Sequence, residues 1–123
     1  MSTAEIAKGL VELCRQNKNI EAIDKYYADN IVSVESVGSP TMPAEMKGIQ
    51  AVKGKNKWWL DNHEVHSAEA NGPFVSDNKF AVEFKYEVTP KASGKRFHMN
   101  EMALYTVEGD KIVHEHFFYN AGG

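Results

Sequence analysis

Hydrophobic residues recur with a helical period in three segments of the first half of the chain. We therefore predict three helices, which end near Gln16, Asp29 and His63. The first begins with a capping-box signature, in which Ser2 is followed three residues later by Glu5. The residues that define one face of each helix are Ile6, Leu10, Leu13 and Cys14, then Ile20, Ile23 and Tyr27, then Ile49, Val52, Asn56, Trp59 and His63.

A short β-branched segment between the second and third helices predicts a strand over residues 31–35. Because side chains alternate along a strand, Ile31 and Ser33 share one face with Glu35. If the helices cover that face, the Glu35 carboxyl lies in an apolar cleft, where its pKa rises toward the range useful for proton transfer. Alternatively, Glu35 ends an edge strand in water. Prolines and glycines in residues 38–48 predict a loop beside it.

After His63 the hydrophobic pattern changes to a period of two, which is typical of half-buried antiparallel strands. Residues 80–88 alternate most clearly, and further strands are predicted over residues 95–107 and 111–119. A weaker strand over residues 65–75 is interrupted by Gly72-Pro73. Helices followed by long strands predict a single α+β domain over residues 1–123, in which three helices cover one face of a curved sheet and leave a cavity.

Charge and composition narrow the function classes. The chain has 123 residues and a formal net charge of −3, which disfavours a nucleic-acid surface. The nearest basic cluster, Lys53, Lys55 and Lys57, spreads around a helix and is interpreted as a solvated face. The single cysteine, Cys14, excludes an internal disulfide framework and favours a reducing compartment.

Targeting and cofactor motifs are absent from the sequence. No basic N-terminal region precedes an apolar stretch, and no apolar run is long enough to cross a bilayer, so we expect a soluble cytoplasmic protein without a membrane partner. The sequence also lacks a glycine-rich phosphate loop, a dinucleotide-binding fingerprint and a nucleophile elbow. We therefore expect no cofactor.

The order of these elements, together with three short motifs, resembles one known superfamily. The motifs are the Tyr-Ala-Asp-Asn ending of the second helix, the Val-Glu-Ser-Val-Gly-Ser stretch at 34–39 and the Gly-Asp-Lys-Ile-Val hairpin at 109–113. Over nearly its whole length the chain resembles the nuclear transport factor 2-like superfamily, particularly its ketosteroid-isomerase-like and SnoaL-like polyketide-cyclase branches. The resemblance implies a cone-shaped, barrel-like fold that encloses a hydrophobic pocket, and a homodimer formed through the outer face of the sheet.

The resemblance also assigns a general base. The isomerases place a carboxylate immediately before a Pro-Val-Gly segment, and Glu35 stands before Ser-Val-Gly here. They stabilise the developing enolate with a tyrosine from the first helix and a protonated aspartic acid near the last hairpin. This chain has Leu10 or Val11 at the first of these positions and Met102 at the second. Steroid isomerisation by that mechanism is therefore not expected, because each such donor lowers the barrier by about 3 kcal/mol.

The position of the missing aspartic acid leaves two alternatives. A shift of one residue in the hairpin alignment places Glu101, and not Met102, in the pocket. Glu101 and Glu35 then form a pair in which one carboxyl is protonated and the other ionised.

The last strand carries further candidates. By resemblance, Glu115, Phe117 and Tyr119 face the pocket, and Glu115 is either a third pocket carboxylate or the cross-strand partner of a lysine or arginine. The opposite face carries His114 and His116, whose spacing suits a metal, but the chain offers no clear further ligands, so we expect none. The remaining candidate ligand-binding residues are Trp59, Phe84, Tyr86 and Met102.

His63 has two interpretations, a satisfied histidine at the rim of the core or a proton shuttle in the pocket. With Glu35 and Glu101 it completes the candidate catalytic set. Two hypotheses for the function follow. The first is an isomerase, cyclase or dehydratase that moves a proton on a small hydrophobic carbonyl compound, with Glu35 as the base and His63, Tyr86 or protonated Glu101 acting at the oxygen. The second is a non-catalytic ligand-binding or dimeric interaction module on the same fold.

Overall fold

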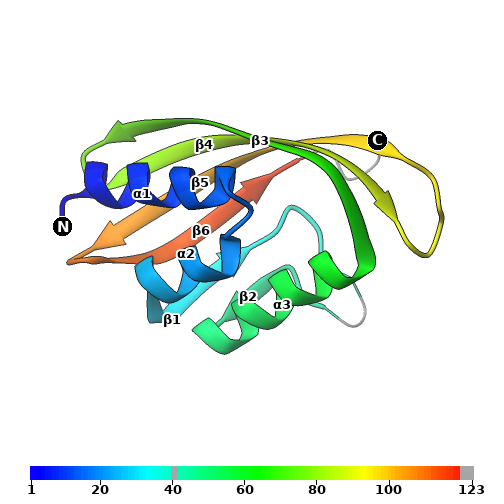
Figure 1. Cartoon of the computed structure of the whole chain (residues 1–123). Helices are drawn as coiled ribbons and strands as arrows, with labels where there is room; N and C mark the ends of the chain where they lie inside the picture. The colour runs from blue at the N-terminus through cyan, green and yellow to red at the C-terminus, as the bar shows by residue number, and fades with distance from the viewer. Residues whose placement is uncertain (40–41, 120–123) are drawn as a thin grey trace.

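A computed structural model describes residues 1–39 and 42–119. Three helices lie on one side of a six-stranded sheet in this part of the chain (Figure 1). The helices are α1 (Thr3–Arg15), α2 (Asn19–Tyr26) and α3 (Ile49–Asn62). The strands are β1 (Tyr27–Val34), β2 (Glu45–Lys47), β3 (His63–Ser76), β4 (Lys79–Pro90), β5 (Phe97–Glu108) and β6 (Lys111–Phe118). The predicted α+β class is confirmed.

The sheet is mixed and open. Its strand order is β2-β1-β6-β5-β4-β3, in which β1 and β6 are parallel and all other neighbours are antiparallel. In the described part of the chain, β2 and β3 are the two edges, so the strands curve around the helices without closing into a barrel (Figure 1). The parallel pairing brings the first strand beside the last one. It thereby places Ser33 opposite Glu115.

The region after α2 differs from the prediction in two places. The helix ends at Tyr26 and not near Asp29, because the backbone of Tyr27 is already extended and pairs with Ile112. The stretch predicted as a loop contains the short strand β2, which pairs with the end of β1. At both places backbone hydrogen bonds to a neighbouring strand outweigh the local preference, which is helical after Tyr26 and for a turn around β2.

The strand β3 is longer and less interrupted than its sequence indicates. It runs past Gly72-Pro73, where Gly72 adopts a positive φ of 126° and the pairing with β4 shifts register between Asn71 and Phe74. The glycine and proline therefore form an irregularity on an edge strand and do not end it.

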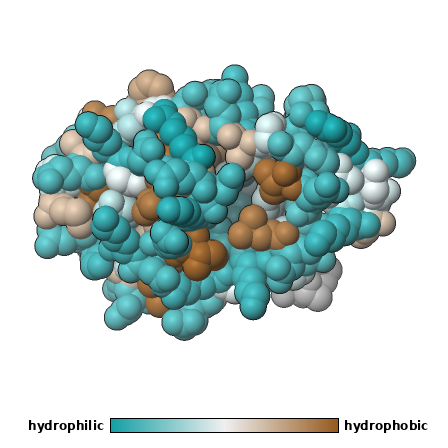
Figure 2. All heavy atoms as spheres, viewed as in Figure 1, coloured by the Kyte–Doolittle hydropathy of each residue, from teal (hydrophilic) through white to brown (hydrophobic). Residues whose placement is uncertain are grey.

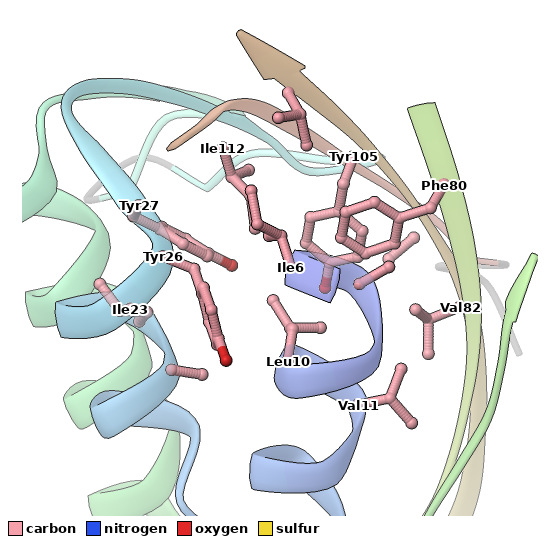
Figure 3. Packing of buried hydrophobic residues seen from close by; sticks show 14 of the residues in the cluster. Ile6, Leu10, Val11, Ile23, Tyr26, Tyr27, Phe80, Val82, Tyr105 and Ile112 are labelled. Carbon is pink, nitrogen blue, oxygen red and sulfur yellow. The ribbon is translucent and has the colours of Figure 1, made fainter. Parts of the chain in front are cut away.

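The hydrophobic core lies between α1 and the middle of the sheet (Figure 3). The predicted capping box of α1 is present, because the Ser2 side chain accepts a hydrogen bond from the Glu5 amide and Glu5 reaches back to Ser2. The helix packs its apolar face on β3 and β4, and the ring of Phe80 on β4 stacks on that of Tyr105 on β5 at 4.7 Å. The residues around these rings are Ile6, Leu10, Val11, Val82 and Ile112.

The opposite face of the sheet leaves several large apolar side chains exposed. Met102, Leu104 and Phe118 are 41%, 37% and 47% exposed. The expected homodimer through this face stays a prediction. None of the described helices is both long enough and apolar enough to cross a membrane.

Candidate functional site

A pocket of about 360 Å³ lies between the inner face of the sheet, helices α2 and α3, and the loop that follows β1. Figure 2 shows hydrophobic side chains bordering a hollow on this side of the molecule. The aromatic lining residues are Trp58, Trp59, Phe84, Tyr86, Tyr105, Phe117 and Tyr119. The structure thus brings Trp59, Phe84, Tyr86, Phe117 and Tyr119 of the candidate ligand-binding set together around one space.

Four charged or ionisable side chains of opposite sign share this largely apolar pocket, namely Glu35, Lys55, Glu101 and Glu115. Glu35 directly follows β1, Lys55 lies on α3, and Glu101 and Glu115 lie on β5 and β6. Because strands β1, β6 and β5 are neighbours, their inward side chains meet although they are far apart in sequence. Three carboxyl groups therefore face one ammonium group.

Glu35 and Lys55 form an ion pair, with 2.8 Å between Nζ and Oε1. Glu35 lies on the covered face that it shares with Ile31 and Ser33, as one of the two interpretations of the sequence required. The Lys55 ammonium also donates to the Ser33 hydroxyl and lies 5.3 Å from the centre of the Phe117 ring. The side chains of Lys55 and Glu35 are 9% and 22% exposed.

The interpretation of Lys55 as part of a solvated face is wrong. Lys55 follows the fully buried Val52 by three residues and precedes Trp59 by four, so all three lie on the inward side of α3. The long aliphatic stem of a lysine packs well among apolar residues while its ammonium reaches a partner. The spacing to Val52 and Trp59 is the signal in the sequence that identifies Lys55 as an inward residue.

The alternation along β5 resolves the choice between Glu101 and Met102. Glu101 shares the inner face with Ala103 and Tyr105 and lines the pocket. Met102 lies on the outer face, which corrects its placement among the ligand-binding residues. Burial, reinforced by the negative charges of Glu35 and Glu115, raises the Glu101 pKa to about 8. The Glu101 carboxyl is therefore protonated at neutral pH.

Glu115 is fully buried on β6, with 1% of its surface exposed. The Tyr27 hydroxyl donates a hydrogen bond to Oε1 of Glu115, whereas Oε2 has no hydrogen-bond partner among the described residues. Burial raises the Glu115 pKa, although the nearby Lys55 charge opposes the shift. The partner is thus a tyrosine at the start of β1 and not a cross-strand lysine or arginine. Sequence reasoning missed Tyr27 because it assigned this residue to the second helix.

Two further hydroxyl groups lie beside the carboxyls. Burial and the neighbouring Glu35 raise the Tyr119 pKa to about 12. Burial and the neighbouring Glu101 likewise raise the pKa of Tyr86. Both phenols are therefore neutral hydrogen-bond donors at physiological pH.

His63 does not line the pocket, which corrects its candidate role as a proton shuttle. Its Nδ1 donates to the carbonyl oxygen of Trp59 at 2.8 Å, and its ring stacks on the Trp59 ring at 4.5 Å. His63 is thus a satisfied histidine at the junction of α3 and β3. His114 and His116 lie next to each other on the far side of the sheet, with ring centres 6.2 Å apart. Residues 1–39 and 42–119 contain no group of three side chains arranged to hold a metal ion.

A family model described as the SnoaL-like domain matches residues 1–119. The chain belongs to the SnoaL-like domain family. It is 46% identical to a protein from Mesorhizobium loti that is provisionally named a SnoaL-like polyketide cyclase, with carbohydrate phosphatase added in brackets. That match covers 97% of this chain and 100% of the other, with a TM-score of 0.92. No protein of curated function matches the chain significantly.

More distant structures share the fold of this SnoaL-like chain. An NTF2-like protein from Burkholderia thailandensis is 16% identical over 98% of this chain and 92% of its own, with a TM-score of 0.81. A protein of ketosteroid isomerase-like fold from Catenulispora acidiphila, in complex with trimethylamine, is 16% identical over 95% of this chain and 86% of its own, with a TM-score of 0.74. The resemblance stated from the sequence is therefore confirmed.

Proposed function

We propose that this SnoaL-like protein binds a small hydrophobic carbonyl compound and catalyses a proton transfer on it, with Glu35 as base and Glu101 as acid. The observation that carries the proposal is the pairing of two carboxyls in different protonation states in one pocket. Glu35 is ion-paired with Lys55 and is therefore a carboxylate. Glu101 holds its proton at neutral pH because its pKa lies near 8.

In the proposed reaction, the Glu35 carboxylate removes a proton from the carbon next to the carbonyl group. The electrons of the C–H bond move toward the carbonyl oxygen, which receives a hydrogen bond from the protonated Glu101. Tyr119 and Tyr86 are neutral donors that lie near the two carboxyls. Return of the proton from Glu35 to another carbon gives an isomerisation. Attack of the enolate on a second carbonyl, with the Glu35 proton passing to the new alkoxide, gives a cyclisation. Loss of a neighbouring hydroxyl, which leaves as water with the Glu35 proton, gives a dehydration.

The pocket itself supports a substrate of this class. Its volume of about 360 Å³ and its aromatic lining suit a compact ring compound. The Mesorhizobium loti relative is provisionally named a SnoaL-like polyketide cyclase, and the two chains align over almost their whole lengths.

The proposal is tested by measuring deuterium exchange into the carbon next to the carbonyl of β-tetralone, a compact bicyclic ketone, by proton NMR in deuterium oxide. The wild-type protein is expected to accelerate exchange above the buffer rate. Glu35→Gln removes the base and is expected to lower the accelerated rate by about a hundredfold or more. Glu45→Gln, on the exposed strand β2, is the matched control and is expected to exchange at the wild-type rate.

Equal exchange rates for wild type and Glu35→Gln would remove Glu35 from the mechanism. Binding of β-tetralone without any acceleration by the wild type would contradict the enzymatic proposal and favour the ligand-binding module. Circular dichroism spectra of both variants establish whether they fold.

A further inference from the structure

Lys55 is the one cationic side chain among the residues that line the pocket, and the proton transfer described above uses it only as the partner of Glu35. We propose that the Lys55 ammonium is also the binding site for the negatively charged oxygen that forms when the substrate loses its proton. The substrate class is then an enolisable ketone or a phenol, whose conjugate base carries its charge on oxygen. This inference rests on the proposed function and deepens it.

The position of the ammonium group supports this role. It is held by Ser33 and Glu35, which are consecutive inward residues at the end of β1, and it borders the ring of Phe117 from β6. Hydrogen bonds to Ser33 on β1 and to Glu35 directly after it fix the ammonium group, which uses two of its three N–H donors for them. The charge therefore stands at a defined point of the pocket wall, directly beside the proposed base.

The charge balance of the pocket gives the physical reason. Before the reaction the negative charge is on Glu35, and the Lys55 ammonium neutralises it at 2.8 Å. Once Glu35 has accepted the proton, the carboxyl is neutral and the negative charge is on the substrate oxygen. Among the described residues, Lys55 then has no other ion-pair partner, and an apolar surrounding makes an unpaired ammonium unfavourable. An oxygen anion next to Lys55 restores the pairing without moving any charge into or out of the pocket.

The other carboxyls fit the same balance. Burial raises the pKa of Glu101 to about 8, so this carboxyl is neutral at pH 7, and burial also raises the pKa of Glu115. A pocket whose one ammonium is already paired with Glu35 has no unpaired positive charge among its lining residues. Such a pocket admits a neutral substrate. It accommodates an anion only when the released proton stays on Glu35, because Glu35 is then neutral and Lys55 is free to pair with the anion. A permanently anionic ligand such as a phosphate ester is disfavoured for the same reason.

The inference is tested with para-nitrophenol, because the visible absorbance of its phenolate reports the ionised fraction directly. At a pH where the free phenol is mostly neutral, binding to the wild type is expected to raise the ionised fraction, since the proton passes to Glu35 and the anion pairs with Lys55. Lys55→Met is expected to abolish this rise. Lys57→Met, an exposed lysine on the same helix, is the matched control and is expected to leave it unchanged.

Glu35→Gln gives a second and opposite signature. In this variant Lys55 has no counter-ion, so at a pH where the phenol is ionised the phenolate is expected to bind at least about tenfold more tightly than to the wild type. Combining Glu35→Gln with Lys55→Met is expected to remove that gain. The two single variants therefore change phenolate binding in opposite directions.

An unchanged ionised fraction in Lys55→Met would overturn the inference, as would weaker phenolate binding by Glu35→Gln. Failure of para-nitrophenol to bind the wild type would also overturn it. These outcomes are distinct from failure of the proposed function, because the exchange of β-tetralone measures proton transfer by Glu35 whether or not Lys55 contacts the oxygen.

Discussion

The inner face of the sheet has two halves with the same alternation of inward and outward residues. In one half the inward residues form packed core, and in the other they line the pocket. Beside α1, the inward residues at the start of β4 are buried in the hydrophobic core, as with Phe80, which is 1% exposed; we call this region the filled half (Figure 3). Under α3 and the loop after β1, the inward residues of β5 and β6 border a pocket and include Glu101 and Glu115.

The difference comes from the element that lies opposite. Helix α1 presents Ile6, Leu10 and Val11, each 0–1% exposed, and its one charged contact with the sheet in the described residues is at its end, where Arg15 donates to the Ala70 carbonyl oxygen. Helix α3 presents Lys55 and Trp59 to the pocket, and neither fills it. The inward residues of a strand do not by themselves determine whether a region becomes packed core or a pocket. The helix that covers the strand determines this.

The largest expected effect comes from matched truncations of two inward phenylalanines on β4. Phe80→Ala is expected to lower the free energy of unfolding by about 3–5 kcal/mol, because Phe80 stacks on Tyr105 inside the filled half. Phe84→Ala is expected to lower it by about 2 kcal/mol or less, because Phe84 already borders the pocket and its removal enlarges an existing space. Urea unfolding followed by circular dichroism measures both. Equal losses would show that the two halves are packed alike.

A second effect concerns the pH dependence of stability. The folded Glu101 has a pKa of about 8, above its ordinary value of 4.5, so the folded state binds more protons than the unfolded state between these values. Stability is therefore expected to fall by an amount on the order of a few kcal/mol as the pH rises through this interval.

The matched variant is Glu101→Gln, which stays neutral at every pH. It is expected to lose less stability than the wild type as the pH rises from about 5 to 8. Unfolding by urea at a series of pH values checks this. Parallel stability curves for the two proteins would contradict the assignment of a buried, protonated Glu101.

A smaller effect distinguishes two lysines of α3. Lys55→Met leaves Glu35 without its partner, and because Glu35 is 22% exposed and partly solvated, the expected loss is about 1–3 kcal/mol, less than for a fully buried pair. Lys53 pairs with Asp24 at the surface, where an ion pair contributes about 0–1 kcal/mol, so Lys53→Met is expected to change little. The same unfolding assay compares them. A larger loss for Lys53→Met would contradict the structural placement of Lys55.

Local signals in the sequence predicted much of the fold. The capping box at Ser2, the helical period of α1 and the strict alternation of β4 identify elements that one local pattern describes along their length. The same signals failed where long-range pairing outweighs local preference. The end of α2 is set by the pairing of Tyr27 with Ile112, and β2 exists because it pairs with β1.

The site was only partly predictable for the same reason. The resemblance and the alternation of β1 and β6 identified Glu35 and Glu115 as pocket candidates, and the structure brings both to the pocket. The choice between Glu101 and Met102 needed the register of β5 against β4 and β6. The catalytic role of His63 was predicted from the helical spacing of α3, but the helix ends at Asn62. The His63 ring instead donates to the Trp59 carbonyl oxygen of the last turn.

The sequence by itself determined the α+β class and the family resemblance and named Glu35 as a candidate base, because periodicity and local motifs are properties of consecutive residues. Only the tertiary structure placed Lys55 and Tyr27 against carboxyls 20 and 88 residues away. Those contacts arise from the parallel pairing of β1 with β6 and from the packing of α3 over them. The protonation of Glu101 likewise depends on burial and on neighbouring charges, and both are set by residues that are distant in the sequence.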